Sequence, residues 1–285
     1  MAEGARGRGL LAGHMARALR AIRRHLAAVD LVIEVADARA PALTRNPHLA
    51  RAAGDKARVL VLARADLAAE GATRRWLAHF ARQGLRAVAV DAVGGAGVER
   101  LRALMQERGQ AGPCRAMVVG VPNVGKSSLI NRLAGRARAH TGALPGVTRG
   151  PQWFRVGDAL LLDLPGVLPP FIRSRETLAR LAALGVVGTD ACPAAEAALA
   201  LIEELRRLAP RELELTYGLR SELGPPEAVL EEIGRRRGCL VAGGRVDLER
   251  TGEALLKDFR LGKLGRVTLE EPPAAGDAGP GDEGG

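Results

Sequence analysis

One eight-residue segment near the middle of the chain constrains the fold more than any other. Residues 120–127 read Gly-Val-Pro-Asn-Val-Gly-Lys-Ser, which matches the phosphate-binding pattern G-x-x-x-x-G-K-[ST]. An apolar run, residues 116–119, precedes the segment, and residues 128–133 follow it with helical spacing. A strand, a loop and a helix in this order surround a phosphate with backbone N–H groups at the positive end of the helix dipole. The segment therefore predicts a site for a nucleoside triphosphate.

Each residue of this loop has an expected part in binding. The Lys126 ammonium group should reach the outer phosphates, and the Ser127 hydroxyl should bind Mg²⁺. The backbone N–H groups should surround the phosphate oxygens, because they converge at the N-terminus of the following helix. The phosphate-binding residues expected in this segment are Asn123, Val124, Gly125, Lys126, Ser127 and Ser128.

The residues before this loop have the pattern of an α/β fold. Residues 31–35, 58–62 and 86–90 are short apolar runs that predict buried strands. Residues 76–80 and 98–101 lie between or after them and predict crossover helices, which join parallel strands. We therefore expect an α/β fold with a mostly parallel sheet flanked by helices.

Two segments after the loop can sense the third phosphate of a bound nucleotide. Thr148 ends the sequence Pro-Gly-Val-Thr, and the apolar run 160–162 leads into Asp163-Leu-Pro-Gly166. Thr148 should complete the Mg²⁺ shell, and Asp163 should hold the ion through water. The Gly166 N–H should contact the γ-phosphate, so both loops become ordered when triphosphate binds.

The segments that read the base stand in an unusual order. In an ordinary GTPase, an Asn-Lys-x-Asp segment and a Ser-Ala-like loop come last. Here the candidates come first: residues 63–66 read Ala-Arg-Ala-Asp, and Asp91-Ala92-Val93 follows the third predicted strand. Such a site is assembled from strand ends in space, and chain termini can be relocated to exposed loops. The sequence therefore predicts a circularly permuted P-loop GTPase domain.

With these motifs the chain resembles the circularly permuted ribosome-assembly GTPases of the ribosome biogenesis GTPase A (YlqF) type. The resemblance covers residues 13–272, nearly the whole chain. It implies a GTPase that acts in late maturation of the large ribosomal subunit. The implied ligands are GTP or GDP and Mg²⁺, and the implied partners are the subunit precursor and its rRNA. Further matching segments are residues 13–18, 37–41, 45–47, 151–153, 237–240 and 243–244.

The chain departs from the family at the base-reading segment. Asp66 is retained, and its carboxylate can accept hydrogen bonds from guanine N1–H and N2–H₂. Adenine would leave that carboxylate unpaired, at a cost of about 1–3 kcal/mol. Arg64 can lay its aliphatic stem across the base, with Ala92 beside it. Ala63 replaces the Asn and can neither bond the base nor brace the phosphate loop. We expect guanine preference with weaker affinity; a nucleotide-impaired RNA-binding scaffold is the alternative.

The residues for GTP hydrolysis and for a monovalent ion match no motif as clear as the phosphate loop. Val167 stands where many GTPases place a water-orienting Gln, so the intrinsic rate should be slow and depend on a partner. The resemblance offers His14 for positioning the water; the alternative is a surface histidine on a basic arm. In related GTPases, an Asn at the position of Asn123 is associated with K⁺ binding, so Asn123 is a candidate K⁺ ligand. The alternative is that this Asn only caps a turn.

Charge favours a polyanionic partner. The net charge is +10, and residues 270–285 carry five acidic and no basic residues, which leaves about +15 on the rest. An Arg-rich genome composition is the alternative cause. Aromatic residues make up only 2%, so contact with phosphates is favoured over base stacking. The basic clusters are Arg17-Arg20-Arg23-Arg24, Arg132-Arg136-Arg138, Arg235-Arg236-Arg237 and Lys257-Arg260-Lys263-Arg266.

The pattern divides the chain into three regions. Residues 1–172 predict the GTPase domain with an N-terminal amphipathic helix. Helical spacing over residues 173–271 predicts a small all-α, RNA-binding domain, or a structural cap on the first domain. Residues 272–285 predict a disordered acidic tail. Three cysteines without metal spacing, and no membrane-length apolar run, favour a cytoplasmic protein; a mitochondrial matrix protein is the alternative because the start is Arg-rich and amphipathic. We expect the protein to be a monomer.

Overall fold

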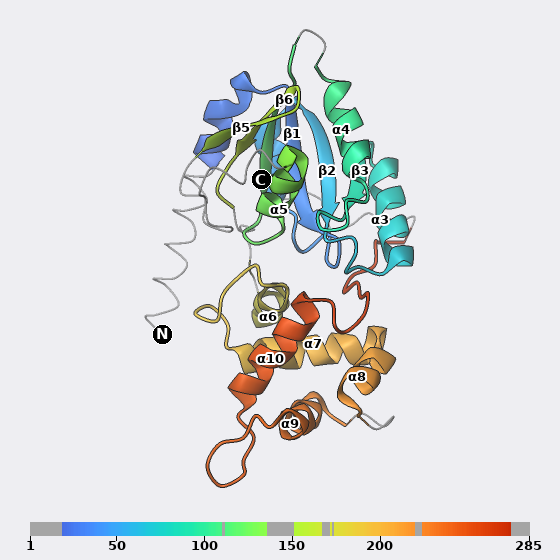
Figure 1. The fold of residues 1–285 in the computed structure, drawn as a ribbon, viewed down its shortest axis with the longest axis vertical. Coiled ribbons are helices and arrows are strands. Elements are labelled where there is room, and N and C mark those ends of the chain that lie inside the picture. Colours follow the sequence, from blue (N-terminus) through green and yellow to red (C-terminus); the bar gives the residue numbers. More distant parts are fainter. Residues whose placement is uncertain are drawn as a thin grey trace.

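The computed structural model describes residues 19–109, 112–135, 151–166, 172, 174–219 and 224–274. These residues form an α/β part and, below it in Figure 1, a part made of helices. The helical part begins where the chain enters α6 (Arg175–Leu184). The arrangement agrees with the fold class expected from the sequence.

The described strands of the α/β part form one sheet. All neighbouring strands are parallel except β5 and β6, which pair in antiparallel fashion. β1 is buried along its whole length, as expected of a central strand with both faces covered. The strand that precedes the phosphate loop is central, although it comes fourth in the chain. The order across the sheet is β3 (Arg86–Val90), β2 (Ala57–Ala63), β1 (Leu31–Asp37), β4 (Arg115–Gly120), β6 (Ala159–Asp163) and β5 (Gln152–Val156).

Helices cover both faces of this sheet. On one face lie α4 (Val98–Gln106) and α5 (Lys126–Ala134), whose apolar residues pack on alternate residues of β1 and β2. On the other face lie α2 (Pro47–Ala53), α3 (Glu70–Arg82) and the helical residues 19–25.

The segments that the apolar pattern marked as strands and helices take those structures. Ile22 is buried against Val32 and Met117, so the described part of the predicted first helix does dock on the sheet. The sequence did not signal α2 or β5, because both are short and carry weak apolar patterns.

The helical part is held together by α7 (Ala194–Leu208), on which α6 and α10 (Leu248–Arg260) pack. A Cβ at Gly252 of α10 would lie 2.6 Å from the Ala194 backbone, so glycine allows the two helices this close approach. α8 (Pro210–Tyr217) and α9 (Pro226–Arg237) complete it, and each begins with proline at its first position.

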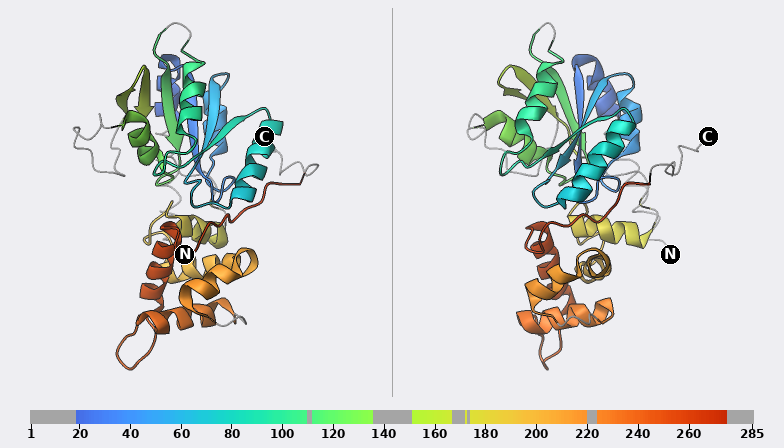
Figure 2. Two further views of the ribbon diagram at one scale, coloured as in Figure 1. Left: turned by 45° about the vertical axis from the view of Figure 1, so that its right-hand side comes forward. Right: turned by 90° about the vertical axis from the view of Figure 1, so that its right-hand side faces the viewer.

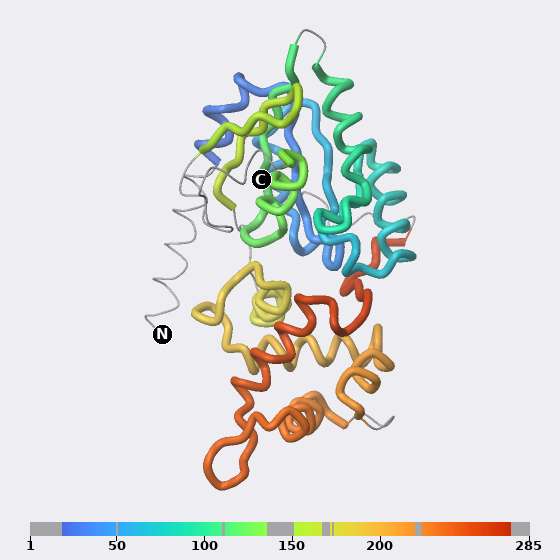
Figure 3. The backbone as a smooth tube through the Cα atoms, viewed as in Figure 1, coloured from blue at the N-terminus to red at the C-terminus, as the bar shows by residue number. Residues whose placement is uncertain are grey.

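The two parts meet at one edge of the sheet. The carboxyl ends of the parallel strands, and therefore the loops that follow them, face α6 and the beginning of the last connection (Figures 1 and 3). After α10 the chain returns to the α/β part: Figure 2 shows this last described segment running from the helices to the side of α3. Residues 275–285, most of the predicted acidic tail, lie outside the described residues.

The cysteines and the lengths of the helices can also be described. Cys114, Cys192 and Cys239 are free and buried, and burial raises the pKa of the Cys114 and Cys192 thiols. Within the part of the chain that the structure describes, every helix is too short or too polar to cross a membrane.

Candidate nucleotide site

The phosphate loop lies at the carboxyl end of β4 and leads directly into α5. Asn123 and Gly125 both take positive φ angles, 55° and 107°, which turn the chain back toward the start of the helix. Glycine adopts such angles without strain, and asparagine tolerates them better than most residues. The loop therefore has the backbone that the sequence predicted between strand and helix.

Lys126 is folded over its own loop. Its Nζ donates hydrogen bonds to the carbonyl oxygens of Gly120 at 3.1 Å and Val121 at 2.7 Å. Burial lowers the pKa of this ammonium group to about 8, and the negative charge of Asp163 opposes the shift. A phosphate at the loop would provide the counter-charge that the two carbonyl groups replace only in part.

The residues expected to hold Mg²⁺ fit that ion as far as they are described. Ser127 is the second residue of α5 and is partly buried. Asp163 is buried at the end of β6, which pairs with the phosphate-loop strand β4 through Val118. A hydroxyl and a carboxylate are hard oxygen donors of the kind that Mg²⁺ prefers. Thr148, the third expected donor, and His14 lie outside the described residues.

Gly166 lies against the phosphate loop. A Cβ at this position would lie 2.7 Å from the backbone Cα of Pro122, so a larger residue would force the two segments apart. This contact brings the Asp163–Gly166 segment beside the loop, where the sequence analysis expected its N–H to meet the γ-phosphate.

The base-reading segments lie side by side after β2 and β3. The Ala65 N–H donates to the Val90 carbonyl at 3.2 Å, and the Asp91 carboxylate accepts from the N–H groups of Val93 and Gly94, both at 2.8 Å. These bonds hold the turn that contains Ala92. The structure thus brings Ala92 and Asp66 to the same edge of the sheet, as a circularly permuted GTPase domain requires.

Asp66 is half-buried in the loop formed by residues 63–69, which we call the base loop. Desolvation raises the pKa of its carboxyl group, and the charge of Asp91 adds to that rise. The positive charges of Arg39 and Arg266 act in the opposite direction. A hydrogen bond from its own backbone N–H also lowers the pKa of this carboxyl group, and more strongly than either arginine does.

Arg64 makes contacts that the sequence analysis missed. It has a positive φ of 58°, and its guanidinium group donates to Asp37 Oδ2 at 3.0 Å and to the Asn123 carbonyl at 2.7 Å. The neighbouring Ala63 has no polar side chain, and its Cβ would be 3.3 Å from a Cβ placed on Gly125. The phosphate loop is therefore braced by Arg64 and not by residue 63, because only the guanidinium fork reaches both partners.

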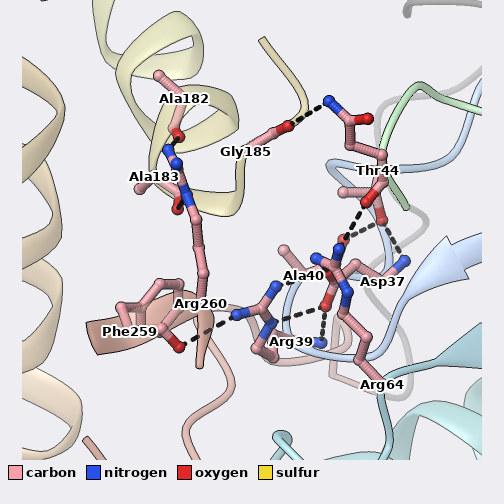
Figure 4. Close-up of polar contacts among 11 residues, drawn as sticks. Asp37, Arg39, Ala40, Thr44, Arg64, Ala182, Ala183, Gly185, Phe259 and Arg260 are labelled. Atoms are coloured by element: carbon pink, nitrogen blue, oxygen red, sulfur yellow. Dashed lines mark hydrogen bonds and ion pairs between the residues drawn. The ribbon is translucent and has the colours of Figure 1, made fainter. Parts of the chain in front are cut away.

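A buried ion pair supports this brace. Asp37, at the end of β1, accepts hydrogen bonds from the Arg39 N–H and guanidinium group and from Arg64 (Figure 4). These bonds and charges hold the pKa of the Asp37 carboxyl below its usual range against the cost of burial. Arg39 is also fully buried and donates to the Phe259 carbonyl at 3.4 Å.

The site also contacts the helical part directly. Asn123 Nδ2 donates to the Gly185 carbonyl at the end of α6, at 2.9 Å (Figure 4). Arg260 of α10 donates to the carbonyl groups of Ala182 and Ala183 in the same helix. The phosphate loop is therefore hydrogen-bonded to the end of α6, which is itself bound to α10.

Several residues of the predicted basic clusters have internal partners. Arg235 and Arg236 pair with Glu231 and Glu232 one turn earlier on α9. Arg237 and Lys263 both pair with the buried Asp258. Arg260 binds α6, and Arg266 binds the base loop. Linear charge clustering therefore overestimated the free positive surface of this part, because it ignores acidic partners that folding brings close.

Comparisons with known proteins agree on one family. A family model described as "50S ribosome-binding GTPase" matches residues 115–216. Ribosome biogenesis GTPase A of Priestia megaterium is 38% identical over 280 residues, which covers 92% of this chain and 96% of that protein. The Thermotoga maritima protein of the same name is 32% identical and covers 91% of this chain and 93% of its own length. The crystal structure of GNP-bound YlqF from T. maritima superposes with a TM-score of 0.65 at 29% identity, over 90% of this chain and 98% of that one.

Proposed function

Because the chain belongs to the ribosome biogenesis GTPase A family and is a GTPase with a role in ribosome assembly, we propose that it acts in late maturation of the large ribosomal subunit. Its α/β part is a circularly permuted P-loop GTPase domain, and GTP or GDP with Mg²⁺ are its expected ligands. The observation that supports the large subunit as the partner is the match of residues 115–216 to the family model described as "50S ribosome-binding GTPase". The hydrogen bond between Asn123 and Gly185 supports coupling to the nucleotide, because it links the phosphate loop to the helical part. A change at the phosphates can then alter how the helical part is held.

The residues of the site have the following proposed roles. The loop residues 123–128 and the Gly166 N–H bind the phosphates, and Ser127, Thr148 and Asp163 hold Mg²⁺. Asp66 recognises guanine beside Ala92, and the stem of Arg64 lies near the base while its guanidinium group braces the loop. His14 positions the attacking water, and Asn123 can bind K⁺ when its amide turns from Gly185 toward the nucleotide.

We propose that rRNA contact uses exposed arginines and lysines outside the internal pairs described above. Arg20, Arg23 and Arg24 are exposed on the first described helix. Arg245 and Arg250 are exposed around the beginning of α10, and Lys257 is exposed in the last turn of that helix. Contact with rRNA phosphates should weaken steeply as salt concentration rises, because each neutralised phosphate releases counterions.

A nucleotide-impaired scaffold is the second candidate, and the replacement of the family's Asn by Ala63 favours it. One set of measurements separates the two: affinity for GDP and GTP, and GTP turnover with and without large ribosomal subunits. Nucleotide binding, with turnover that rises when subunits are added, supports the GTPase switch. RNA binding with no nucleotide affinity supports the scaffold. His14→Ala should leave nucleotide affinity intact and reduce turnover; normal turnover would rule out its catalytic role.

A further inference from the structure

The connection after α10 lies along the base loop. We call residues 262–271 the strap, because they join α10 to the α/β part. The Val267 N–H donates to the Leu67 carbonyl at 3.0 Å, and the Ala69 N–H donates to Thr268 Oγ1 at 3.0 Å. The strap therefore supplies hydrogen-bond partners to the residues that follow Asp66, at a sequence distance of about two hundred residues.

Arg266 contacts the base loop on both sides of Asp66. Its Nε donates to the Ala68 carbonyl at 3.0 Å, and its Nη2 donates to the Ala65 carbonyl at 3.1 Å. These two carbonyl groups stand on either side of Asp66 in sequence, so one planar guanidinium group spans the turn. A fork of fixed geometry fixes the distance between its two acceptors, which a flexible ammonium group does not.

The strap is anchored firmly enough to impose this geometry. Val267 and Leu269 are buried, and the Leu269 N–H donates to the Arg39 carbonyl at 2.7 Å. The Glu270 carboxylate accepts from the N–H groups of Ala42 and Leu43, at 2.8 and 3.1 Å. The Glu270 carbonyl also accepts from the Trp76 indole at 3.1 Å. Arg266 is thus held between an anchored segment and the loop that it spans.

The base loop has few other supports of its own. Outside the strand ladder, its described backbone bonds inside the α/β part run from Leu67 N–H to the Arg64 carbonyl at 3.0 Å and from Ala65 N–H to the Val90 carbonyl. At its two ends, the Ala63 carbonyl accepts from Ala38 N–H at 2.8 Å and the Ala69 carbonyl accepts from Thr73 N–H at 2.9 Å. A carboxylate that selects a base must be held within a few tenths of an ångström of its place, because hydrogen bonds weaken steeply with distance and angle. The carbonyl groups of Ala65 and Ala68 accept their hydrogen bonds from Arg266.

We propose that Arg266 is a positioning residue for guanine selectivity: through the strap, the segment that follows the helical part holds the turn that aims Asp66 at the base. This rests on the proposed function, since it takes Asp66 to be the residue that reads guanine. It gives the strap a part in ligand choice in addition to joining the two parts of the molecule. It also replaces the expectation that Arg266 belongs to an RNA-binding surface.

The test compares GDP with inosine diphosphate on the full-length chain. Inosine diphosphate lacks the 2-amino group from which Asp66 should accept a hydrogen bond. The affinity for GDP divided by the affinity for inosine diphosphate therefore reports how well that carboxylate is positioned. Arg266→Gln should lower the ratio about five- to tenfold while changing the affinity for inosine diphosphate less than twofold. Arg266→Lys should give an intermediate ratio, because the charge remains and the fork is lost. Asp66→Ala sets the lower limit.

The matched control is Arg211→Gln, which removes a positive charge from an exposed position on α8 and should leave the ratio unchanged. Thr268→Val keeps the shape of the strap and removes the acceptor for the Ala69 N–H, so it should lower the ratio by about twofold. A loss of affinity shared equally by both nucleotides, or an unchanged ratio in Arg266→Gln and Thr268→Val, overturns the proposal. If the unmodified chain shows no preference for GDP, the proposed function fails and not only the role of Arg266.

Discussion

The two ends of the nucleotide site are built in different ways. The phosphate end is one continuous stretch from Arg115 to Ala134: a strand, a loop and a helix whose own backbone makes the binding surface. The base end is assembled from residues 37–39, 63–69 and 262–271, which touch only in the folded chain. The phosphate end therefore takes its binding surface from one segment, to which Arg64 and Gly185 add single hydrogen bonds. The base end instead depends on how the two parts of the molecule are joined.

Because the two ends are built differently, substitutions at each end should affect different properties of the protein. A change in the phosphate loop should remove nucleotide binding and leave the fold intact. A change at the base end should alter stability or selectivity, because the same residues hold the two parts together. Arg64 is the link between the ends, since one guanidinium group contacts both Asp37 and the phosphate loop.

The largest effect should come from Lys126→Ala. Removal of the ammonium group takes away the charge that meets the outer phosphates, and we expect about a thousandfold loss of affinity for GTP and GDP. Calorimetric titration with each nucleotide measures this. Arg132→Ala, an exposed position on the same helix, is the control and should bind normally. Near-normal affinity in Lys126→Ala would mean that the phosphates bind elsewhere.

The next largest effect should come from Asp37→Asn, and it should be on stability. The amide leaves the buried Arg39 without its counter-charge, so the free energy of unfolding at pH 7 should fall by about 3 kcal/mol. Chemical denaturation measures it.

The pH dependence follows from the lowered pKa of the Asp37 carboxyl. The stabilisation is present above the ordinary value of 3.8 and is lost as pH falls through the folded-state pKa. The difference in the free energy of unfolding between the unsubstituted protein and the Asn variant should therefore become smaller as the pH falls. A difference that stays constant down to the lowest pH measured would show that the charge of Asp37 is not the cause.

The sequence predicts the two ends of the site from different kinds of signal. The phosphate loop, Asp163 and Gly166 are assigned because each motif is local and its spacing encodes its backbone geometry. Asp66 is assigned from the remnant of a four-residue motif. Asp37, Arg39 and Arg266 were not assigned to the site, because their partners lie far away in sequence and nothing local separates Arg266 from a surface arginine. Long-range hydrogen bonds become visible only when the fold is known.

A smaller effect should come from Arg64→Ala. This variant loses the bond to the Asn123 carbonyl, so the phosphate loop is less well positioned for every nucleotide. We expect the affinities for GDP and inosine diphosphate to fall together, by about five- to tenfold. This shared loss contrasts with the selective loss expected for Arg266→Gln. A change in the ratio of the two affinities would mean that Arg64 reads the base and does not mainly brace the loop.

The smallest effect should come from Glu270→Gln, although this partly buried residue anchors the strap. Burial raises the pKa of its carboxyl group more than the hydrogen bonds from Ala42 and Leu43 lower it. The folded state therefore favours the protonated form, and stability should decline as pH rises from the ordinary value of 4.5 through the raised folded-state value. A neutral amide of the same shape avoids that decline and loses part of the hydrogen bonding.

These two terms oppose each other, so the net change in the free energy of unfolding at pH 7 should stay below about 1 kcal/mol. The native chain should lose more stability than the Gln variant between pH 4.5 and neutrality. Chemical denaturation at several pH values measures the change at pH 7 and the dependence of stability on pH. A large loss in the variant at all pH values would show that the charge of Glu270 itself holds the strap. The base end would then rely on two ionic anchors, Asp37 and Glu270, and its dependence on the helical part would be stronger than the hydrogen bonds alone require.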